Sequence, residues 1–461
     1  MDIIQEVRED LQNLLGLSPP DFLALQEKRF LKYLEEMYKN SDFYRKHLEK
    51  NGIYSEEDLP KSISQINKLP ILNKDFFVRW TASNETLDNI KCTMHTSGTT
   101  QKPMKVDYTL ESIRQGWGFL GIRAFLLMGI DLEEKGMMLT SIDKKTRDSH
   151  SSHINTLALK EILGDKLIDQ PIIEPLDESL DKITMEKIKW IGTVPAFYNA
   201  SVFRSKERKI DMKKMGIKTL FFGGVDFPKN QKKIVRDYYN SEILGFYVLT
   251  ELCTAGTQVS KKCNLIKMSN PNHYILFSDQ IIFEFLDDEG KPVKKNERGR
   301  VIATPLFMDG MPLIRYEVGD DALFHGYKNN FPVISDIRRR SAVSFGHGVL
   351  NHYEVESIKE SLITKTGISV SGFQVAKKNG KKGIDLPILR IETNGPLSSE
   401  EEKLLKNLST ELFMKNEQMK ALIEFGPDNG GIHKPLVEFY EYGKLVGEGI
   451  FKPKLISDET K

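Results

Sequence analysis

The sequence predicts an α/β protein with a large N-terminal domain of mixed sheets and helices and a small α+β C-terminal domain. Between residues 91 and 304, short apolar runs that suit buried strands alternate with longer amphipathic stretches that suit helices. After Arg340 the alternation continues in shorter segments. The chain has 461 residues, 39% of them hydrophobic, and a single core stops growing well below this length. At least two domains are therefore expected.

The first 80 residues are expected to form a helical lead-in. Apolar side chains recur there at helical spacing before and after residues 40–42, where Asn-Ser-Asp interrupts the pattern. They are Phe30, Leu31, Leu34, Met37 and Tyr38 before the break, and Phe43, Tyr44 and Leu48 after it. This spacing is typical of core contacts, so we expect helices that break at this point.

Later elements are predicted from apolar runs and from one capping signal. Strands are expected at 190–191, 219–222, 281–286 and 301–304, and in the small domain near 368–375, 388–392 and 436–440. Ser398 and Glu401 have the spacing of a capping box, which predicts a helix through Leu412. A charged cluster at 336–340 follows an extended apolar segment. We therefore place the N-terminal domain at 1–337 and the C-terminal domain at 338–461.

Charge and cysteine content restrict the class of protein. Lys and Arg (66) balance Asp and Glu (65), so the chain lacks the positive field that attracts nucleic acid or an acidic membrane, and neither partner is expected. The N-terminal run MDIIQEVREDLQNLL carries acids where a signal peptide needs basic residues, and no apolar run approaches the length of a membrane span. The three cysteines fit a reducing compartment. We expect a cytoplasmic protein, and the sequence leaves a homodimer open.

The run MHTSGTTQKP at 94–103 has the composition of a phosphate-binding loop. Gly98 permits positive φ angles, so that successive N–H groups can face one concavity. Hydroxyl and ammonium donors add to it: Thr96, Ser97, Thr99, Thr100 and Lys102. The alternative is a solvated Ser/Thr/Gly linker, because short motifs often occur by chance.

Three later segments carry groups that suit the rest of a nucleotide. Gly223, Gly224 and Val225 follow a predicted strand, where the glycines allow a flat ligand such as a purine to approach the backbone. The run GFYVLTE at 245–251 ends the next apolar stretch, and the run at 304–320 ends in Gly-Asp. We expect the carboxylate of Asp320 to accept hydrogen bonds from both ribose hydroxyls.

The segment 245–251 offers three different groups at the end of a strand. Tyr247 could stack on a base, Thr250 could contact a phosphate, and Glu251 could supply the hard oxygen ligand that Mg²⁺ requires. Open α/β sheets commonly bind ligands at such strand ends. The alternative is a strand end that carries a solvated acid.

In these segments the chain resembles the adenylate-forming superfamily, and specifically its phenylacetate–coenzyme A ligase branch. Residues 96–103 resemble the family's TSGTTGKP loop, 247–251 its YGxTE motif, and 312–320 its MPLIRYRTGD segment. Arg340-Ser341 resembles the GRSDD hinge, and NSDFYR at 40–45 and KLPILNK at 68–74 are similar to the start of that branch. The motifs occur in family order, and the resemblance spans nearly the whole chain.

The resemblance implies an AMP-forming acid–thiol ligase. In this family a carboxylate attacks the α-phosphorus of ATP, pyrophosphate leaves, and the thiol of coenzyme A captures the acyl-adenylate. ATP, Mg²⁺ and coenzyme A are therefore the expected cofactors, and a small-molecule carboxylic acid is the expected substrate. Two alternatives stay open, namely transfer of the adenylate to an amine or a carrier-protein thiol, and a nucleotide-binding protein that has lost turnover.

The resemblance also implies roles for residues near the hinge and the C-terminus. Arg340 would face the nucleotide. Lys452 best matches the family's lysine that bridges the carboxylate and the α-phosphate, with Lys444 and Lys454 as rivals. A lysine suits this role because its flexible stem can deliver a charge when a mobile lid domain closes and withdraw it when that domain rotates. Lys452, Thr250 and Glu251 are the expected catalytic residues.

The resemblance places the acyl pocket at 193–199, 222–225 and 246–249. These residues are mostly apolar and aromatic, which favours an aryl or small hydrophobic acid over an amino acid. The expected contacts are Pro195, Phe197, Tyr198 and Phe246, and the aromatic members could equally be core residues. His150 or His153 could hydrogen-bond the acid, although exposed histidines beside a helix N-cap are the alternative.

The chain departs from the family pattern at two points. Gln101 stands where the phosphate loop has glycine, and Ala342-Val343 stand where the hinge has two aspartates. The first change affects a tight turn next to the nucleotide, and the second affects the rotation that thiolation needs. Cys253, Cys263 and His273 suggest a zinc site, but their spacing is more open than that of typical zinc ligands.

Overall fold

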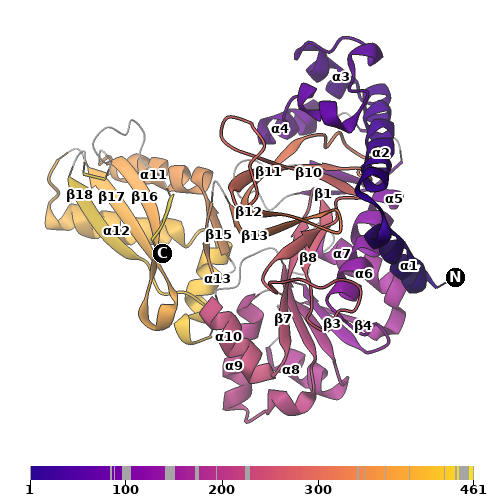
Figure 1. Cartoon of the computed structure of the whole chain (residues 1–461). Coiled ribbons are helices and arrows are strands. Elements are labelled where there is room, and N and C mark those ends of the chain that lie inside the picture. Colours follow the sequence, from indigo (N-terminus) through magenta and orange to yellow (C-terminus); the bar gives the residue numbers. More distant parts are fainter. Residues whose placement is uncertain are drawn as a thin grey trace.

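The computed structural model describes most of the chain (Figure 1). The described residues are 2–83, 86–87, 89–95, 105–140, 151–171, 176–193, 195–223, 229–339, 342–346, 348–368, 370–393, 395–429, 431–441, 444–445 and 456–459. Residues 96–103 of the predicted phosphate loop, His150, Gly224, Val225, Arg340 and Lys452 therefore lie outside the described residues.

Within these ranges, an 11-stranded sheet organises the large domain. Strands β4-β3-β5-β6-β7 run parallel, and β8-β9-β13-β12-β11-β10 continue the sheet in antiparallel pairing. The sheet therefore changes from parallel to antiparallel between β7 and β8. The bounds are β3 Gly136–Thr140, β4 Leu167–Pro171, β5 Trp190–Thr193, β6 Thr219–Gly223, β7 Glu242–Leu249, β8 Cys253–Gln258, β9 Tyr274–Leu276, β10 Ile281–Leu286, β11 Arg298–Pro305, β12 Tyr316–Lys328 and β13 Phe331–Arg339.

Helices cover both faces of the parallel half, because successive side chains of a strand point to opposite faces. Phe221 of β6 packs on Phe125, in the core shared with the N-terminal helices. Its neighbours Leu220 and Phe222 lie in a second core with α8, α9 and α10. The helices are α5 Leu110–Ile113, α6 Leu120–Leu127, α7 Ser151–Leu163, α8 Leu176–Met185, α9 Pro195–Glu207 and α10 Lys229–Tyr239, with a π-helix at Arg114–Phe119. The predicted α/β class is confirmed.

The N-terminal lead-in is helical, as the sequence predicts. It consists of α1 (Ile3–Gly16), α2 (Pro19–Asn40), α3 (Asp42–Glu49) and α4 (Lys74–Ser83), with short 3₁₀ turns between α3 and α4. Ser41 ends α2 and caps α3, because its hydroxyl accepts a hydrogen bond from the N–H of Tyr44. The predicted break at residues 40–42 is therefore present, and its cause is an N-cap serine.

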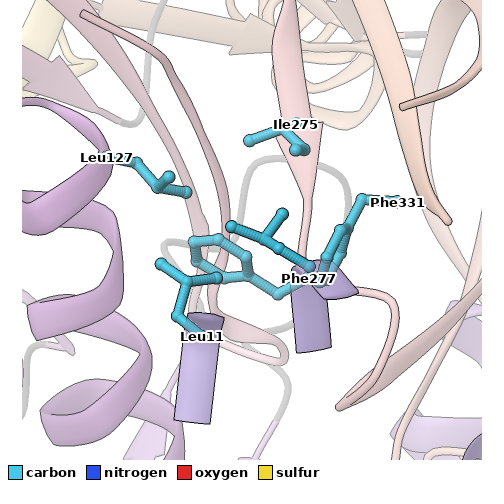
Figure 2. Close-up of a pocket in the computed structure, with 6 residues that line it drawn as sticks. Leu11, Leu127, Ile275, Phe277 and Phe331 are labelled. Carbon is cyan, nitrogen blue, oxygen red and sulfur yellow. The ribbon is translucent and has the colours of Figure 1, made fainter. Parts of the chain in front are cut away.

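Helix α1 docks on the antiparallel half of the sheet. Figure 2 shows Leu11 of α1 and Leu127 of α6 facing Ile275, Phe277 and Phe331. With Leu15, these side chains line a gap that is too small to admit a water molecule. All of the lining side chains are apolar, so this gap belongs to the packing of the lead-in and offers no group that could recognise a phosphate or a carboxylate.

A hairpin of β1 (Ile90–His95) and β2 (Lys105–Thr109) stands apart from the large sheet. Its strands flank residues 96–104, which include most of the phosphate loop predicted at 94–103. The buried side chains Met94, Val106 and Tyr108 face the protein core. The hairpin therefore anchors both ends of the predicted loop.

The C-terminal residues form a smaller unit with a core of its own, drawn in orange and yellow in Figure 1. Its elements are β14 Ala342–Phe345, β15 Gly348–Asn351, α11 His352–Thr366, β16 Val370–Asn379, β17 Asp385–Thr393, α12 Ser399–Phe413, α13 Glu417–Phe425, β18 Leu436–Glu441 and β19 Ile456–Asp458. The four-stranded sheet has the order β18-β17-β16-β19 in the described residues. The exact boundary at 337/338 and the mobility of this unit stay predictions.

Local signals in the small domain are confirmed. Ser398 and Glu401 form the expected capping box at the start of α12, and the predicted strands near 368–375, 388–392 and 436–440 correspond to β16, β17 and β18. The described helices include none that is both long enough and apolar enough to cross a bilayer.

Candidate functional site

The described site residues cluster where β7 ends. Tyr247 lies on β7, and Thr250 and Glu251 form the turn that leads into β8. Asp320 lies on β12, 73 residues later in the chain than Tyr247, yet the hydroxyl of Tyr247 donates a hydrogen bond to Oδ2 of Asp320 at 2.9 Å. Both side chains are buried. The structure thus brings together the group predicted to contact the base and the group predicted to bind the ribose.

A second tyrosine connects the same two segments in the opposite direction. The hydroxyl of Tyr316, at the start of β12, donates to Oε1 of Glu251 at 2.9 Å. Tyr316 is fully buried, and Phe77 packs edge-on against its ring with a centroid distance of 5.0 Å. The orientation of the predicted metal ligand is therefore set by a hydroxyl that has little freedom to move.

A third tyrosine connects the phosphate-loop hairpin to the turn after β7. Tyr108 on β2 donates from its hydroxyl to the carbonyl oxygen of Thr250. Burial raises the pKa of Tyr108 well above its usual value of 10, so the phenol stays protonated and remains a donor. Tyrosine hydroxyls thus join three segments in the part of the chain that the structure describes: the hairpin, the turn after β7 and the start of β12. The sequence analysis assigned all three to one nucleotide.

The start of β12 is held by a buried arginine. Arg315 has a positive φ of 51° and donates to both carboxylate oxygens of Glu284, at 2.9 and 2.8 Å. It also donates to the carbonyl oxygen of Leu69 at 2.6 Å, and the main chain of Leu72 bonds to residues on both sides of Tyr316. The run at 68–74, which the sequence singled out by resemblance, therefore braces the segment that carries Tyr316 and Asp320.

A buried carboxylate holds the base of the hairpin. Oδ1 of Asp107 accepts a hydrogen bond from the hydroxyl of Thr93 at 2.5 Å, and Oδ2 lies 2.8 Å from the ammonium of Lys105. A Cβ atom on Gly310 would lie 2.5 Å from the carbonyl oxygen of Asp107, so only glycine fits this approach. The hairpin is thereby fixed against the segment that precedes β12.

The surroundings of Glu251 are those of a metal-ligating carboxylate rather than those of a carboxylate in a structural ion pair. Its side chain is buried, its recorded partner is the neutral Tyr316 hydroxyl, and it takes part in no ion pair with a described residue. Buried carboxylates normally need a positive partner. Hard oxygen atoms of this kind are the ligands that Mg²⁺ prefers, so the residues present fit the ion that the sequence analysis expects.

Gly223 ends β6 next to β7. A Cβ atom there would lie 3.0 Å from the side chain of Val248 and 3.3 Å from the carbonyl oxygen of Phe246. Close pairing of the two strands therefore already favours glycine at this position. A contact between Gly223 and a purine stays a prediction.

The predicted acyl-pocket residues lie in two separate cores. Phe197 and Tyr198 belong to the core under α8, α9 and α10, whereas Phe246 packs with Phe125 and Phe221 on the other face of the sheet. The Tyr198 hydroxyl lies 2.8 Å from each of two main-chain carbonyl oxygens that can accept its proton, so it already has the partners of a core tyrosine. Pro195 is buried at the start of α9. Their contact with an acyl group stays a prediction.

His153 lies in the first turns of α7 and is buried, not exposed as the N-cap alternative expects. Its Nδ1 is 3.8 Å from Oδ2 of Asp169 on the edge strand β4. This separation suits an electrostatic contact rather than a direct hydrogen bond. A role of His153 in binding the acid stays a prediction.

The three residues considered for zinc have other surroundings. Cys253 is buried near Met308, and burial raises the pKa of its thiol well above the usual value. Cys263 is also buried, and His273 stacks on His325 with ring centroids 3.9 Å apart. Among the described residues, no three His, Cys, Asp or Glu side chains gather as metal ligands do.

Sequence reasoning missed Tyr108, Tyr316 and Asp107. A signal for Tyr316 was nonetheless present, because a tyrosine stands four residues before the acid in both segments: Tyr247 before Glu251, and Tyr316 before Asp320. The missed tyrosines supply hydroxyls, whereas the sequence analysis looked for charges and glycines.

Comparisons with known proteins find relatives in sequence and solved structures of similar fold. No family model matches the chain. A protein from Thermus thermophilus named phenylacetate-coenzyme A ligase is 23% identical over 309 residues, and one of the same name from Aromatoleum evansii is 24% identical over 336 residues. The matches cover 64% and 68% of this chain, and the chain spans the same shares, 64% and 68%, of the two relatives.

Solved structures share the fold. A 2-hydroxyisobutyryl-CoA ligase in complex with its adenylate and CoA superposes with a TM-score of 0.70 at 15% identity, over 96% of this chain and 91% of that one. An amide bond synthetase from Marinactinospora thermotolerans gives a TM-score of 0.52 at 14% identity, over 77% of this chain and 66% of that one. The chain thus has the fold of the adenylate-forming superfamily and is similar in sequence to its phenylacetate–coenzyme A ligase branch.

Proposed function

We propose that the protein is an enzyme that activates a carboxylic acid with ATP, releases pyrophosphate, and transfers the acyl group to coenzyme A. The observation that carries this proposal is the set of tyrosine hydrogen bonds that joins the hairpin of the phosphate loop, the turn at Thr250-Glu251 and the strand of Asp320. One bound nucleotide could contact all three segments. The names of the two curated relatives support the same reaction.

In this proposal the chain's own residues mainly position charge. Asp320 accepts hydrogen bonds from the ribose hydroxyls, the donors of the 96–102 loop bind phosphate oxygens, and Lys452 brings a positive charge to the reacting carboxylate. Glu251 holds Mg²⁺, which when bound offsets negative charge on the phosphates. Arg340 faces the nucleotide.

Transfer to a thiol is supported by the arrangement of the whole chain. The 2-hydroxyisobutyryl-CoA ligase superposes with a TM-score of 0.70 in its thioesterification state and 0.60 in an open conformation. One protein in two states differs in the placement of its parts rather than in their folds. The arrangement of this chain is therefore more similar to the thioesterification state of that ligase than to its open conformation, and both of those structures hold CoA and the adenylate.

The test is a screen of aryl and short aliphatic acids for ATP–pyrophosphate exchange, followed by measurement of coenzyme A consumption. We expect exchange with at least one aryl or small hydrophobic acid, and thioester formation when coenzyme A is added. Lys452→Ala should abolish exchange, whereas Lys444→Ala and Lys454→Ala, at the two rival positions, should leave it. Exchange without coenzyme A consumption would indicate that the acyl acceptor is an amine or a carrier-protein thiol. The absence of exchange with every acid would refute acid activation.

A further inference from the structure

Two tyrosines exchange hydrogen bonds between the segments that carry the proposed nucleotide ligands. Tyr247 stands four residues before Glu251 and bonds to Asp320, and Tyr316 stands four residues before Asp320 and bonds to Glu251. Both bonds are 2.9 Å long and buried. The two segments therefore form a reciprocal pair, which we name the tyrosine clasp.

We propose that the tyrosine clasp divides the positioning of the nucleotide between its two hydroxyls. Tyr316 orients Glu251 for the divalent cation, and the hydroxyl of Tyr247 orients Asp320 for the ribose. Both are positioning residues, because they act through the carboxylates. This inference rests on the proposed function for the identity of the ligands, and it adds a separate task for each tyrosine.

The chemistry of a phenol suits this task. A carboxylate has several acceptor positions, and a tyrosine donates one hydrogen bond to it without neutralising its charge. An arginine or lysine in the same place would cancel the charge that a cation needs. Tyr316 therefore fixes one oxygen of Glu251 and leaves the negative charge to attract a metal ion.

The surroundings of Tyr316 keep its hydroxyl in place before any ligand arrives. The ring is fully buried and is held edge-on by Phe77. The main chain on both sides is bonded to Leu72, through the carbonyl oxygen of Arg315 and the N–H of Glu317, each at 2.9 Å. A carboxylate oriented in advance loses less conformational freedom when it binds, which favours affinity.

The clasp is tested by binding, so that its outcome does not depend on turnover. Titration calorimetry measures the affinity for ATP with Mg²⁺ and with EDTA, and for 2′,3′-dideoxy-ATP, in the wild type, Tyr316→Phe and Tyr247→Phe. Tyr239→Phe is the matched control, because Tyr239 is a buried tyrosine at the end of α10 whose hydroxyl contacts Ser201 of α9. Each change removes one oxygen atom and leaves the ring.

We expect Tyr316→Phe to weaken binding of ATP with Mg²⁺ about tenfold and to leave binding in EDTA unchanged, because one hydrogen bond to a charged group is lost. Tyr247→Phe should weaken the binding of ATP about tenfold both with Mg²⁺ and with EDTA. It should weaken the binding of dideoxy-ATP much less. Tyr239→Phe should change none of the three affinities. A Tyr316→Phe change added to Glu251→Gln should have no further effect, since its partner carboxylate is already gone.

Equal affinities in Tyr316→Phe and the wild type, or the same loss with Mg²⁺ and with EDTA, would overturn the assignment of Tyr316. A loss for dideoxy-ATP as large as the loss for ATP would overturn that of Tyr247. Binding that follows the expected pattern in a protein without pyrophosphate exchange would refute the proposed function and leave the clasp intact. Melting temperatures within a few degrees of the wild type show that each variant is folded.

Discussion

Two buried carboxylates, in different regions of the large domain, have opposite kinds of partner. Asp279, in the turn between β9 and β10, lies 2.7 Å from Arg123 of α6 and 3.2 Å from Arg29 of α2, and Arg123 also pairs with Asp10 of α1 at 2.7 Å. Glu251, at the end of β7, accepts a hydrogen bond from the neutral Tyr316. Asp279 has no exposed surface, and Glu251 is 7% exposed.

The difference between these partners distinguishes the structural role of Asp279 from the binding role that we propose for Glu251. Arginines neutralise Asp279 and tie three helices to one turn, so its charge serves the fold. Tyr316 orients Glu251 and leaves its charge in place, which suits a cationic ligand. A buried acid with a neutral donor is therefore a better candidate for a binding site than a buried acid with a salt bridge.

The largest effect on stability should come from Asp279→Ala. It leaves the guanidinium of Arg123 buried near Phe277 without its main partner, and such losses cost about 3–5 kcal/mol. Chemical denaturation measures the change. The control is Glu289→Ala in the exposed pair with Lys291, which should change the free energy of unfolding by at most about 0.5 kcal/mol. Equal effects of the two changes would contradict the structural role of Asp279.

Glu251→Gln should show the reverse pattern. Pyrophosphate exchange should fall about a hundredfold, or about 3 kcal/mol of transition-state stabilisation, because the amide cannot replace the charge on a metal ligand. Stability should stay the same or rise, since a buried charge without a cationic partner among the described residues is removed. Exchange assays and thermal melts are compared on the same preparation. If the melting temperature of Glu251→Gln fell as far as that of Asp279→Ala, the proposed difference in role between the two acids would be wrong.

A weaker test concerns the third tyrosine. Tyr108→Phe removes the hydroxyl that connects the phosphate-loop hairpin to the carbonyl oxygen of Thr250, and a neutral hydrogen bond contributes about 1 kcal/mol. We expect the KM for ATP to rise about fivefold with kcat little changed, because the loop is less well placed before binding. Steady-state kinetics at saturating acid measure this. A fall in kcat with KM unchanged would mean that Tyr108 acts on the chemical step.

Sequence patterns predicted local secondary structure better than they predicted hydrogen-bond partners that lie far apart in the chain. The capping box of Ser398 and the break at Ser41 follow from residues a few positions apart, and both are present. The bond from Tyr316 to Glu251 joins residues 65 positions apart and depends on how β7 and β12 approach each other. No local rule fixes that approach. The resemblance identified the acids of the predicted site, and only the structure could identify the groups that donate hydrogen bonds to them.

The aromatic residues of the predicted acyl pocket illustrate the same limit. Tyr198 and Phe246 are equally apolar in sequence, but the alternation of strand and helix places them on opposite faces of the sheet. Both faces are covered by helices, so apolar residues are needed on each for packing alone. Composition therefore could not distinguish a pocket from a core.

A third kind of buried group, with neither an arginine nor a tyrosine partner, should give the smallest effect. Nε2 of His47 on α3 is buried without a hydrogen-bond partner in the described part of the chain, and its ring packs against Phe76. Burial, with a smaller contribution from the positive charges of Arg79 and Lys50, lowers the pKa of His47 from 6.5 to about 4.

The sign of the resulting pH dependence follows from this lowered pKa. Above pH 6.5 the imidazole is neutral in the folded and the unfolded chain, so it has no effect on stability. Between pH 6.5 and about 4 the unfolded chain binds a proton that the folded chain does not, so the free energy of unfolding decreases as the pH is lowered. Because His47 is only half-buried, we expect less than about 1 kcal/mol between pH 7 and pH 5. His47→Gln should remove this part of the pH dependence in denaturation curves, and an unchanged slope would show that other groups cause it.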